Sequence, residues 1–148
     1  MRTRHINRKV VLKKMAGKPI EVYSFFSGAG FLDLGFEEAG FDIVFVNEFN
    51  KQFLNVYQYA RRNNEKLPQY GYSNEDIRNF LSDENWYSRF PRYNDRTNKL
   101  IGFIGGPPCP DFSVAGKNEG ETGVNGQLTS VYVDLIVCRE PDFFVLQN

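Results

Sequence analysis

The chain has 148 residues, 18 basic and 18 acidic side chains, and a formal net charge of zero, which suits one domain with a single hydrophobic core. Its 41% hydrophobic and 24% charged residues are ordinary for a soluble globular protein, and no apolar run approaches the ~20 residues of a membrane helix. No secretory signal opens the chain, and two cysteines with one histidine exclude a disulfide framework and leave little scope for a metal site.

A basic segment begins the chain. Residues 1–18 carry seven lysine and arginine side chains and no acidic one. Such a cluster is typical of a solvated terminal arm, and it is also typical of an arm that contacts nucleic-acid phosphates, which it attracts whatever their sequence. The segment alone leaves both interpretations open. We therefore divide the chain into a basic arm, 1–18, and a folded domain, 19–148.

The first two predicted elements are a strand and a helix. The apolar stretch 21–26 predicts a short buried strand that ends in a glycine turn. The next stretch predicts a helix, because Leu32, Phe36 and Ala39 fall at helical spacing and Gly40 suits the position after its end.

A second strand and a second helix follow. The stretch FDIVFVNEF predicts a strand that ends at 47–48. The helix after it has Asn50 as its predicted N-cap, with Phe53, Tyr57 and Ala60 on one face.

The pattern weakens beyond residue 65. We expect a short third strand near 76–77, then a helix and a surface loop over 83–99. The stretch KLIGFIGG predicts a fourth strand, a polar glycine-rich loop follows, and PDFFVLQN predicts a fifth strand. Between them a helix has Leu128, Val131, Leu135 and Cys138 at helical spacing, which predicts a buried, inert Cys138.

Five strands alternating with helices predict an open, doubly wound, mostly parallel α/β sheet. Ligands bind such sheets at the carboxyl ends of the strands, near the topological switch point. The residues expected at those ends are Phe26 to Gly30, Glu48, Asp76, Ile77, Gly105 to Cys109 and Gln147.

The first strand end predicts a nucleoside site. Gly28 and Gly30 allow a tight turn and the close approach of a ligand, and Glu48 follows at about the spacing at which an acid meets ribose hydroxyls. NAD is one candidate, but Asp33 stands where the dinucleotide motif has its third glycine. An acid in the first helical turn would repel pyrophosphate and favour a cationic ligand such as S-adenosylmethionine.

The fourth strand end presents a thiol. Cys109 follows GGPP, whose prolines restrict the backbone and fix the direction of the side chain. A cysteine is nucleophilic only as its thiolate. His5 is the single histidine of the chain, which makes a Cys–His pair a poor explanation, and no second thiol lies at metal-ligand spacing. We interpret Cys109 as a presented nucleophile rather than a structural cysteine.

Three stretches resemble the DNA cytosine-5 methyltransferases. FFSGAGFLDLGFEEAGFDIVFVNEF, GGPPCPDFSVAGK and PDFFVLQN follow one another in the family's order over 21–148, and the PPC-x-x-FS-x-AG element is highly specific. The resemblance implies the family's Rossmann-like, S-adenosylmethionine-dependent fold, of which 19–148 would hold the first five strands.

The resemblance also implies roles for individual residues. The residues implied for binding S-adenosylmethionine, and its product S-adenosylhomocysteine, are Phe26, Ser27, Gly28, Ala29, Gly30, Glu48, Phe49, Asp76, Ile77 and Pro108. Glu48 would bind the ribose, and Asp76 the exocyclic amine of adenine. Cys109 would attack carbon 6 of a cytosine flipped out of the duplex, so that carbon 5 takes the methyl group before the cysteine is expelled. Pro108 would also help close the base pocket, and Ser113 would lie near the DNA backbone.

The sequence departs from the family pattern in two serious ways. Gln147 stands where the family has a glutamate that delivers a proton to the base, and one general acid usually contributes ~10²–10⁴-fold in rate. The chain also ends at Asn148, before the family's remaining elements and its target recognition domain. Pro110, Phe31 and Ser24 are lesser departures.

We therefore expect a fragment, or one half of a split enzyme, that does not methylate DNA alone. Its expected partners are double-stranded DNA and either a complementing C-terminal polypeptide or a second copy bound through the exposed sheet edge. The expected setting is the prokaryotic cytoplasm, or another intracellular compartment with DNA. The alternatives are a non-catalytic module that keeps cofactor or partner binding, and a tRNA-directed relative that uses the same thiol.

Overall fold

The computed structural model describes residues 17–63, 66–108 and 124–147. The elements in chain order are β1 (Ile20–Phe25), α2 (Phe31–Glu38), β2 (Asp42–Asn47), α3 (Lys51–Ala60), β3 (Tyr72–Ser73), α4 (Ile77–Leu81), α5 (Trp86–Arg89), β4 (Leu100–Gly105), α6 (Val124–Arg139) and β5 (Phe143–Leu146). Within these residues no helix is long and apolar enough to cross a membrane.

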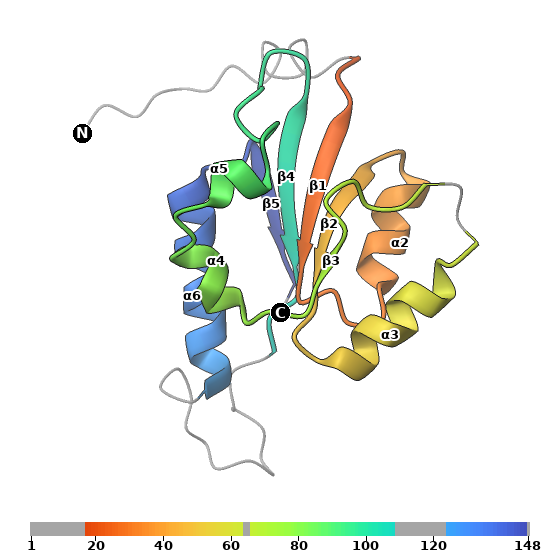
Figure 1. Cartoon of the computed structure of the whole chain (residues 1–148), viewed down its shortest axis with the longest axis vertical. Coiled ribbons are helices and arrows are strands. Elements are labelled where there is room, and N and C mark those ends of the chain that lie inside the picture. The colour runs from red at the N-terminus through yellow and green to blue at the C-terminus, as the bar shows by residue number, and fades with distance from the viewer. Residues whose placement is uncertain (1–16, 64–65, 109–123, 148) are drawn as a thin grey trace.

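The strands form one five-stranded sheet in the order β3-β2-β1-β4-β5, and each neighbouring pair is parallel. Helices α2 and α3 cover one face, and α4, α5 and α6 cover the other (Figure 1). The predicted open, doubly wound α/β fold is confirmed. Because the order reverses at β1, the switch point lies between β1 and β4, and the carboxyl ends of the strands meet at one edge.

Helix α2 ends in the glycine motif that the sequence predicted. Gly40 has a φ of +86° and its N–H donates to the Glu37 carbonyl at 3.0 Å. The next N–H, of Phe41, donates to the Phe36 carbonyl at 3.0 Å, and the two rings contact with centroids 5.0 Å apart. These paired bonds with their apolar contact satisfy the last carbonyls of the helix.

Helix α3 begins as predicted but buries a different face. The Asn50 side chain accepts hydrogen bonds from the N–H groups of residues 52 and 53, which confirms it as the N-cap. Leu54 and Tyr57 are the buried residues, whereas the Phe53 side chain is 52% exposed. The prediction that Phe53 shares the face of Tyr57 was therefore wrong by one position, because Leu54 takes the place against the sheet.

The third strand lies earlier than predicted. It is the two-residue β3, paired with the end of β2, and the predicted position 76–77 instead begins α4. Asp76 is the N-cap of that helix. A two-residue strand has no periodicity to detect, and an N-cap acid next to Ile77 was mistaken for a strand end.

The segment predicted as a surface loop over 83–99 is partly core. Trp86 and Phe90 are fully buried and Tyr93 is 1% exposed, and all three rings contact Tyr23 of β1. The short helix α5 spaces these aromatic side chains so that they cover the sheet beside α6. Burying large rings stabilises the fold far more than the polar neighbours of the segment suggest.

Cys138 is exposed, so its predicted burial was wrong. The inward face of α6 instead contains Tyr132, Leu135 and Ile136. Arg139, one turn beyond Leu135, continues that face, because its guanidinium reaches carbonyl groups at the end of α4. The apolar character of Cys138 placed it on the wrong side of the helix.

Two glycines should respond to alanine in opposite directions. A Cβ at Gly102 of β4 would overlap the Phe143 ring of β5, whereas a Cβ at Gly35 of α2 meets no atom within 4 Å. We expect Gly102→Ala to lower the free energy of unfolding by ~1–3 kcal/mol through overpacking. Gly35→Ala should raise it by about 0.5–1 kcal/mol, because alanine loses less entropy in a helix. Urea unfolding followed by the fluorescence of Trp86 measures both, and equal effects would contradict the packing of β5 on β4.

Candidate functional site

A pocket of about 520 Å³ lies at the carboxyl ends of the strands. Its lining comes from the turn after β1, the ends of β2 and β4, and the starts of α3 and α4, with one residue of α6. Seven residues implied by the family resemblance line it together: Phe26, Gly28, Glu48, Phe49, Asp76, Ile77 and Pro108. The predicted strand-end site therefore exists as a pocket.

Glu48 connects two walls of this pocket. One oxygen of its carboxylate accepts a hydrogen bond from the Gly28 N–H at 2.8 Å, and the other accepts one from the Asn50 N–H at 2.7 Å. The side chain thus joins the glycine turn after β1 to the start of α3, and only 9% of the residue is exposed. Each oxygen keeps a second acceptor position for a ligand hydroxyl.

Two asparagine amides fasten the neighbouring segment. Asn47 Nδ2 donates to the carbonyl groups of Ser73 and Glu75, at 3.3 and 2.9 Å. Asn74 Nδ2 donates in the opposite direction, to the carbonyls of 48–49 at 2.8 and 2.6 Å. The segments after β2 and β3 are therefore held together side by side at the pocket.

The turn after β1 uses left-handed backbone. Phe26, Gly28 and Gly30 have φ values of +51°, +55° and +87°. Gly28 faces the pocket, but Gly30 does not: a Cβ there would come within 2.5 Å of the Tyr57 ring and the Arg61 guanidinium. Gly30 therefore allows α3 to support the turn from behind, which is a role in packing.

Asp33 does not face the pocket, so the charge argument against NAD was wrong. Its carboxylate is fully buried and accepts hydrogen bonds from Ser24 Oγ at 2.7 Å and Tyr57 Oη at 2.8 Å. Burial raises the pKa of Asp33, against the effect of these two donors and of nearby Arg61. The third residue of α2 points inward to the sheet, where it joins β1 to α3.

Asp76 and Ile77 reach the pocket as the start of α4. One oxygen of the Asp76 carboxylate accepts the Arg78 N–H at 2.9 Å, and the other pairs with the Arg78 guanidinium at 2.8 Å. Ile77 is 2% exposed and joins the pocket to the core. The described part of the chain contains no group of three His, Cys, Asp or Glu side chains placed to hold a metal ion.

Sequence reasoning missed part of the lining, namely Asn47, Asn50, Phe53, Arg78, Gly106 and Leu128. Phe53 matters most among them, because it adds a second large ring beside Phe49, and the two are 52% and 66% exposed. Their spacing of four residues across the start of α3 was the available signal. It was overlooked because Phe53 was placed on the buried face.

A second groove, of about 390 Å³, lies on the other side of the glycine turn. Ser27, Ala29, Phe31 and Gln147 line it but not the pocket. Phe26, Gly28, Gly106 and Pro108 line both, so pocket and groove adjoin. The exposed Gln147 is held through its main chain, whose N–H donates to the Gly105 carbonyl at 2.9 Å.

Three committed features lie outside the described residues. They are Cys109, Ser113 and most of the predicted basic arm, 1–16. Pro108, which directly precedes Cys109 in the sequence, is described, and it lines both the pocket and the groove.

The chain is similar to known DNA methyltransferases. It is 52% identical to the type II methyltransferase M.NmeDI of Neisseria meningitidis serogroup C, over 86% of this chain and 31% of that protein. It is 36% identical to M.FnuDI of Fusobacterium nucleatum, over 87% and 32%. A crystal structure of an E. coli prophage protein, described as a DNA modification methyltransferase, superposes with a TM-score of 0.62 at 28% identity, over 86% of this chain and 31% of that one.

The chain thus spans about a third of the length of these relatives. The family model for the C-5 cytosine-specific DNA methylases matches residues 20–148, which is the whole sheet with its helices and its strand-end pocket. This chain belongs to the C-5 cytosine-specific DNA methylase family.

Proposed function

We propose that this chain forms the cofactor-binding part of an enzyme that methylates carbon 5 of cytosine in DNA, with S-adenosylmethionine as the methyl donor. Family membership and the relatives named type II methyltransferases support the reaction. The observation that carries the proposal is the pocket itself, which places the Glu48 carboxylate beside exposed aromatic rings and borders Pro108, next to Cys109 in the sequence.

The pocket residues fit an adenosine group. Its volume lies within the ~300–1,000 Å³ typical of ligand sites. Glu48 can accept hydrogen bonds from ribose hydroxyls, Phe49 and Ile77 offer apolar surface to a purine, and Asp76 can accept from its exocyclic amine. When bound, S-adenosylmethionine supplies an electrophilic methyl group.

Cys109 carries the covalent step of the proposal. Its thiolate forms a bond to carbon 6 of a flipped-out cytosine, which makes carbon 5 nucleophilic. Once carbon 5 carries the methyl group, loss of its proton restores the ring double bond and breaks the bond between sulfur and carbon 6. Pro108 would direct the thiol, and Ser113 would contact the DNA backbone.

Gln147 favours a second candidate function, a non-catalytic module that keeps the cofactor site. It lines the groove next to the pocket, at the position where the resemblance implies a glutamate. Glutamine can hydrogen-bond a cytosine but cannot protonate it, so the base would stay a poor electrophile.

We also propose that a second polypeptide covers the β5 side of the sheet. β5 is an edge strand, and exposed apolar side chains lie on it and on α6: Phe144, Val133 and Val137 are 56%, 43% and 69% exposed. An uncovered edge beside apolar surface favours association. The polypeptide would carry the remaining elements and the DNA-reading domain, and a second copy of this chain is the alternative occupant.

Glu48→Gln tests the cofactor site. The amide would set an N–H against the Gly28 or Asn50 N–H and would lose the charge that ribose hydroxyls bind. We expect the affinity for S-adenosylhomocysteine, measured by calorimetry, to fall by about 10–100-fold, the size of a hydrogen bond to a charged group. Glu38→Gln, at an exposed position of α2, is the matched control and should bind normally. Equal affinity in both variants would refute the role of Glu48.

Cys109→Ser tests the nucleophile in an enzyme assembled from this chain and the C-terminal two thirds of the Neisseria meningitidis relative. DNA containing 5-fluorocytosine should trap the unsubstituted enzyme covalently, because fluorine cannot leave carbon 5 as the proton does. Cys109→Ser should form no adduct and still bind S-adenosylhomocysteine. Cys138→Ser alters the exposed cysteine of α6 and should form the adduct normally. An adduct in Cys109→Ser would refute the assignment.

Gln147→Glu separates the two candidate functions in the same assembled enzyme. If the glutamine limits an otherwise competent site, restoring the acid should raise the rate of methyl transfer by ~10²–10⁴-fold. Radiolabelled methyl transfer to cytosine DNA measures this. Absence of transfer with either residue, despite cofactor binding, would favour the non-catalytic module.

A further inference from the structure

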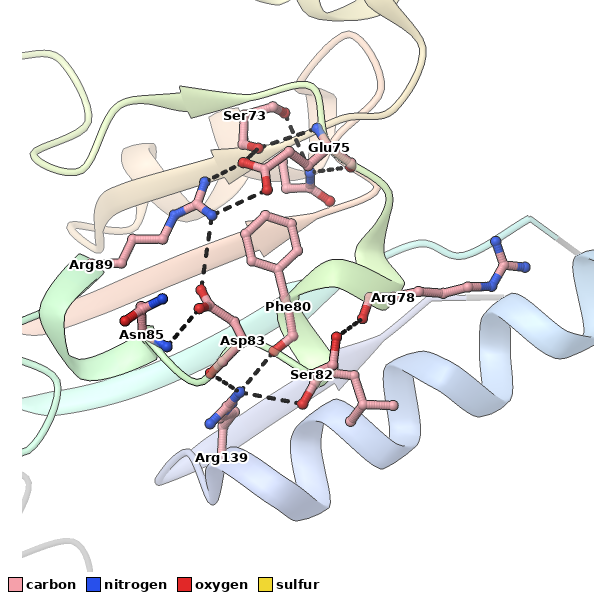
Figure 2. A network of polar contacts seen from close by, with 11 residues as sticks. Ser73, Glu75, Arg78, Phe80, Ser82, Asp83, Asn85, Arg89 and Arg139 are labelled. Atoms are coloured by element: carbon pink, nitrogen blue, oxygen red, sulfur yellow. Dashed lines mark hydrogen bonds and ion pairs between the residues drawn. The ribbon is translucent and has the colours of Figure 1, made fainter.

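The segment that brings Asp76 to the pocket is held from two directions (Figure 2). From β2, Asn47 Nδ2 donates to the Glu75 carbonyl at 2.9 Å. From α5, the Arg89 guanidinium donates to both oxygens of the Glu75 carboxylate, at 2.6 and 3.3 Å, and Ser73 Oγ adds a third hydrogen bond at 2.9 Å. The residue directly before Asp76 is thus fixed at its main chain and at its side chain.

Arg89 is itself fixed by its surroundings. Its guanidinium lies over the Phe80 ring, 4.7 Å from the centroid, and a second acid, Asp83, lies 4.0 Å away. A two-pronged arginine–carboxylate contact is directional as well as attractive. The hydrogen bonds from Arg89 also hold the pKa of Glu75 below its ordinary value, so the pair stays ionised at neutral pH.

The other end of α4 is fastened from α6. One nitrogen of Arg139 donates to the carbonyls of Phe80 and Asp83, at 2.8 and 3.1 Å, while its guanidinium lies over the Trp86 ring, 4.6 Å from the centroid. A five-residue helix is too short to be stable alone. The direction of α4, and of the Asp76 carboxylate at its start, therefore depends on these contacts from α5 and α6.

We propose that Glu75 and Arg89 form a positioning pair that aims Asp76 at the adenine amine and so sets the preference for an adenosyl over an inosyl cofactor. The inference rests on the proposed function, in which Asp76 binds that amine. Asp76 lines the pocket, whereas Glu75 and Arg89 do not, so they act through it. Their side chains are 44% and 32% exposed, and such a pair contributes little to stability, so its removal should leave the fold intact.

The test compares two ligands on the same chain. S-Inosylhomocysteine carries a carbonyl oxygen in place of the amine of S-adenosylhomocysteine, so it offers the Asp76 carboxylate an acceptor instead of a donor. We expect the unsubstituted chain to prefer S-adenosylhomocysteine by at least about tenfold in calorimetry. This ratio should fall about threefold or more in Glu75→Gln and in Arg89→Gln. Both ligands bind the same folded fraction, so a substitution that only destabilises the fold leaves the ratio unchanged.

Three further variants interpret the result. Glu84→Gln, at an exposed acid between α4 and α5, should keep the full ratio. Arg89→Lys keeps the charge without the two-pronged contact and should give an intermediate ratio. Asp76→Asn should abolish the preference. If Asp76→Asn does so while the Glu75 and Arg89 variants keep the full ratio, the positioning proposal is overturned and the proposed function stands. An unchanged ratio in Asp76→Asn would overturn the adenine role of Asp76, and the positioning proposal with it.

Discussion

The Glu48 carboxylate is the interaction around which the pocket is arranged. It accepts the N–H of Gly28 with one oxygen and that of Asn50 with the other, and the carbonyl of the same residue accepts from Asn74. Three segments separated in sequence therefore meet at one residue. Without that carboxylate, two backbone donors at the pocket would lose their partner, which is costly where water is partly excluded. The parallel sheet brings the strand ends to one edge, and Glu48 fixes their spacing.

A second buried acid keeps the layer behind the pocket in place. Asp33 joins β1 to α3 through Ser24 and Tyr57. The Arg61 guanidinium lies over the Tyr57 ring, 4.0 Å from the centroid, and donates to the Gly30 carbonyl at 2.9 Å. A polar network of this kind is stabilising only when its members are satisfied. Here it fixes the left-handed turn from behind, so the residues that face the pocket are free of that task.

The sequence predicted those features whose cause is local. Gly40 and Asn50 end and begin helices through their own backbone chemistry, and both were found where expected. The alternation of strands and helices also fixed the edge on which Glu48 lies. The errors concern residues whose place depends on distant partners. Asp33 and Cys138 were assigned to faces from their character alone, while the sheet and the carbonyls at the end of α4 decide which face of each helix is buried. Trp86 was taken for a loop residue because its aromatic partners are far away in sequence.

The acids of the pocket and the residue at the end of β5 differ in how they are prepared. Glu48 and Asp76 accept backbone N–H groups at the starts of α3 and α4, so their positions are set by the fold, and little ordering remains for a ligand to induce. Gln147 is exposed on an edge strand and held through its main chain. A group that must exchange protons or hydrogen bonds with a base works only when it is positioned and shielded from water. Under the proposed function, the cofactor site is therefore built within this chain, whereas the groove at Gln147 becomes a catalytic site only when the β5 side is covered.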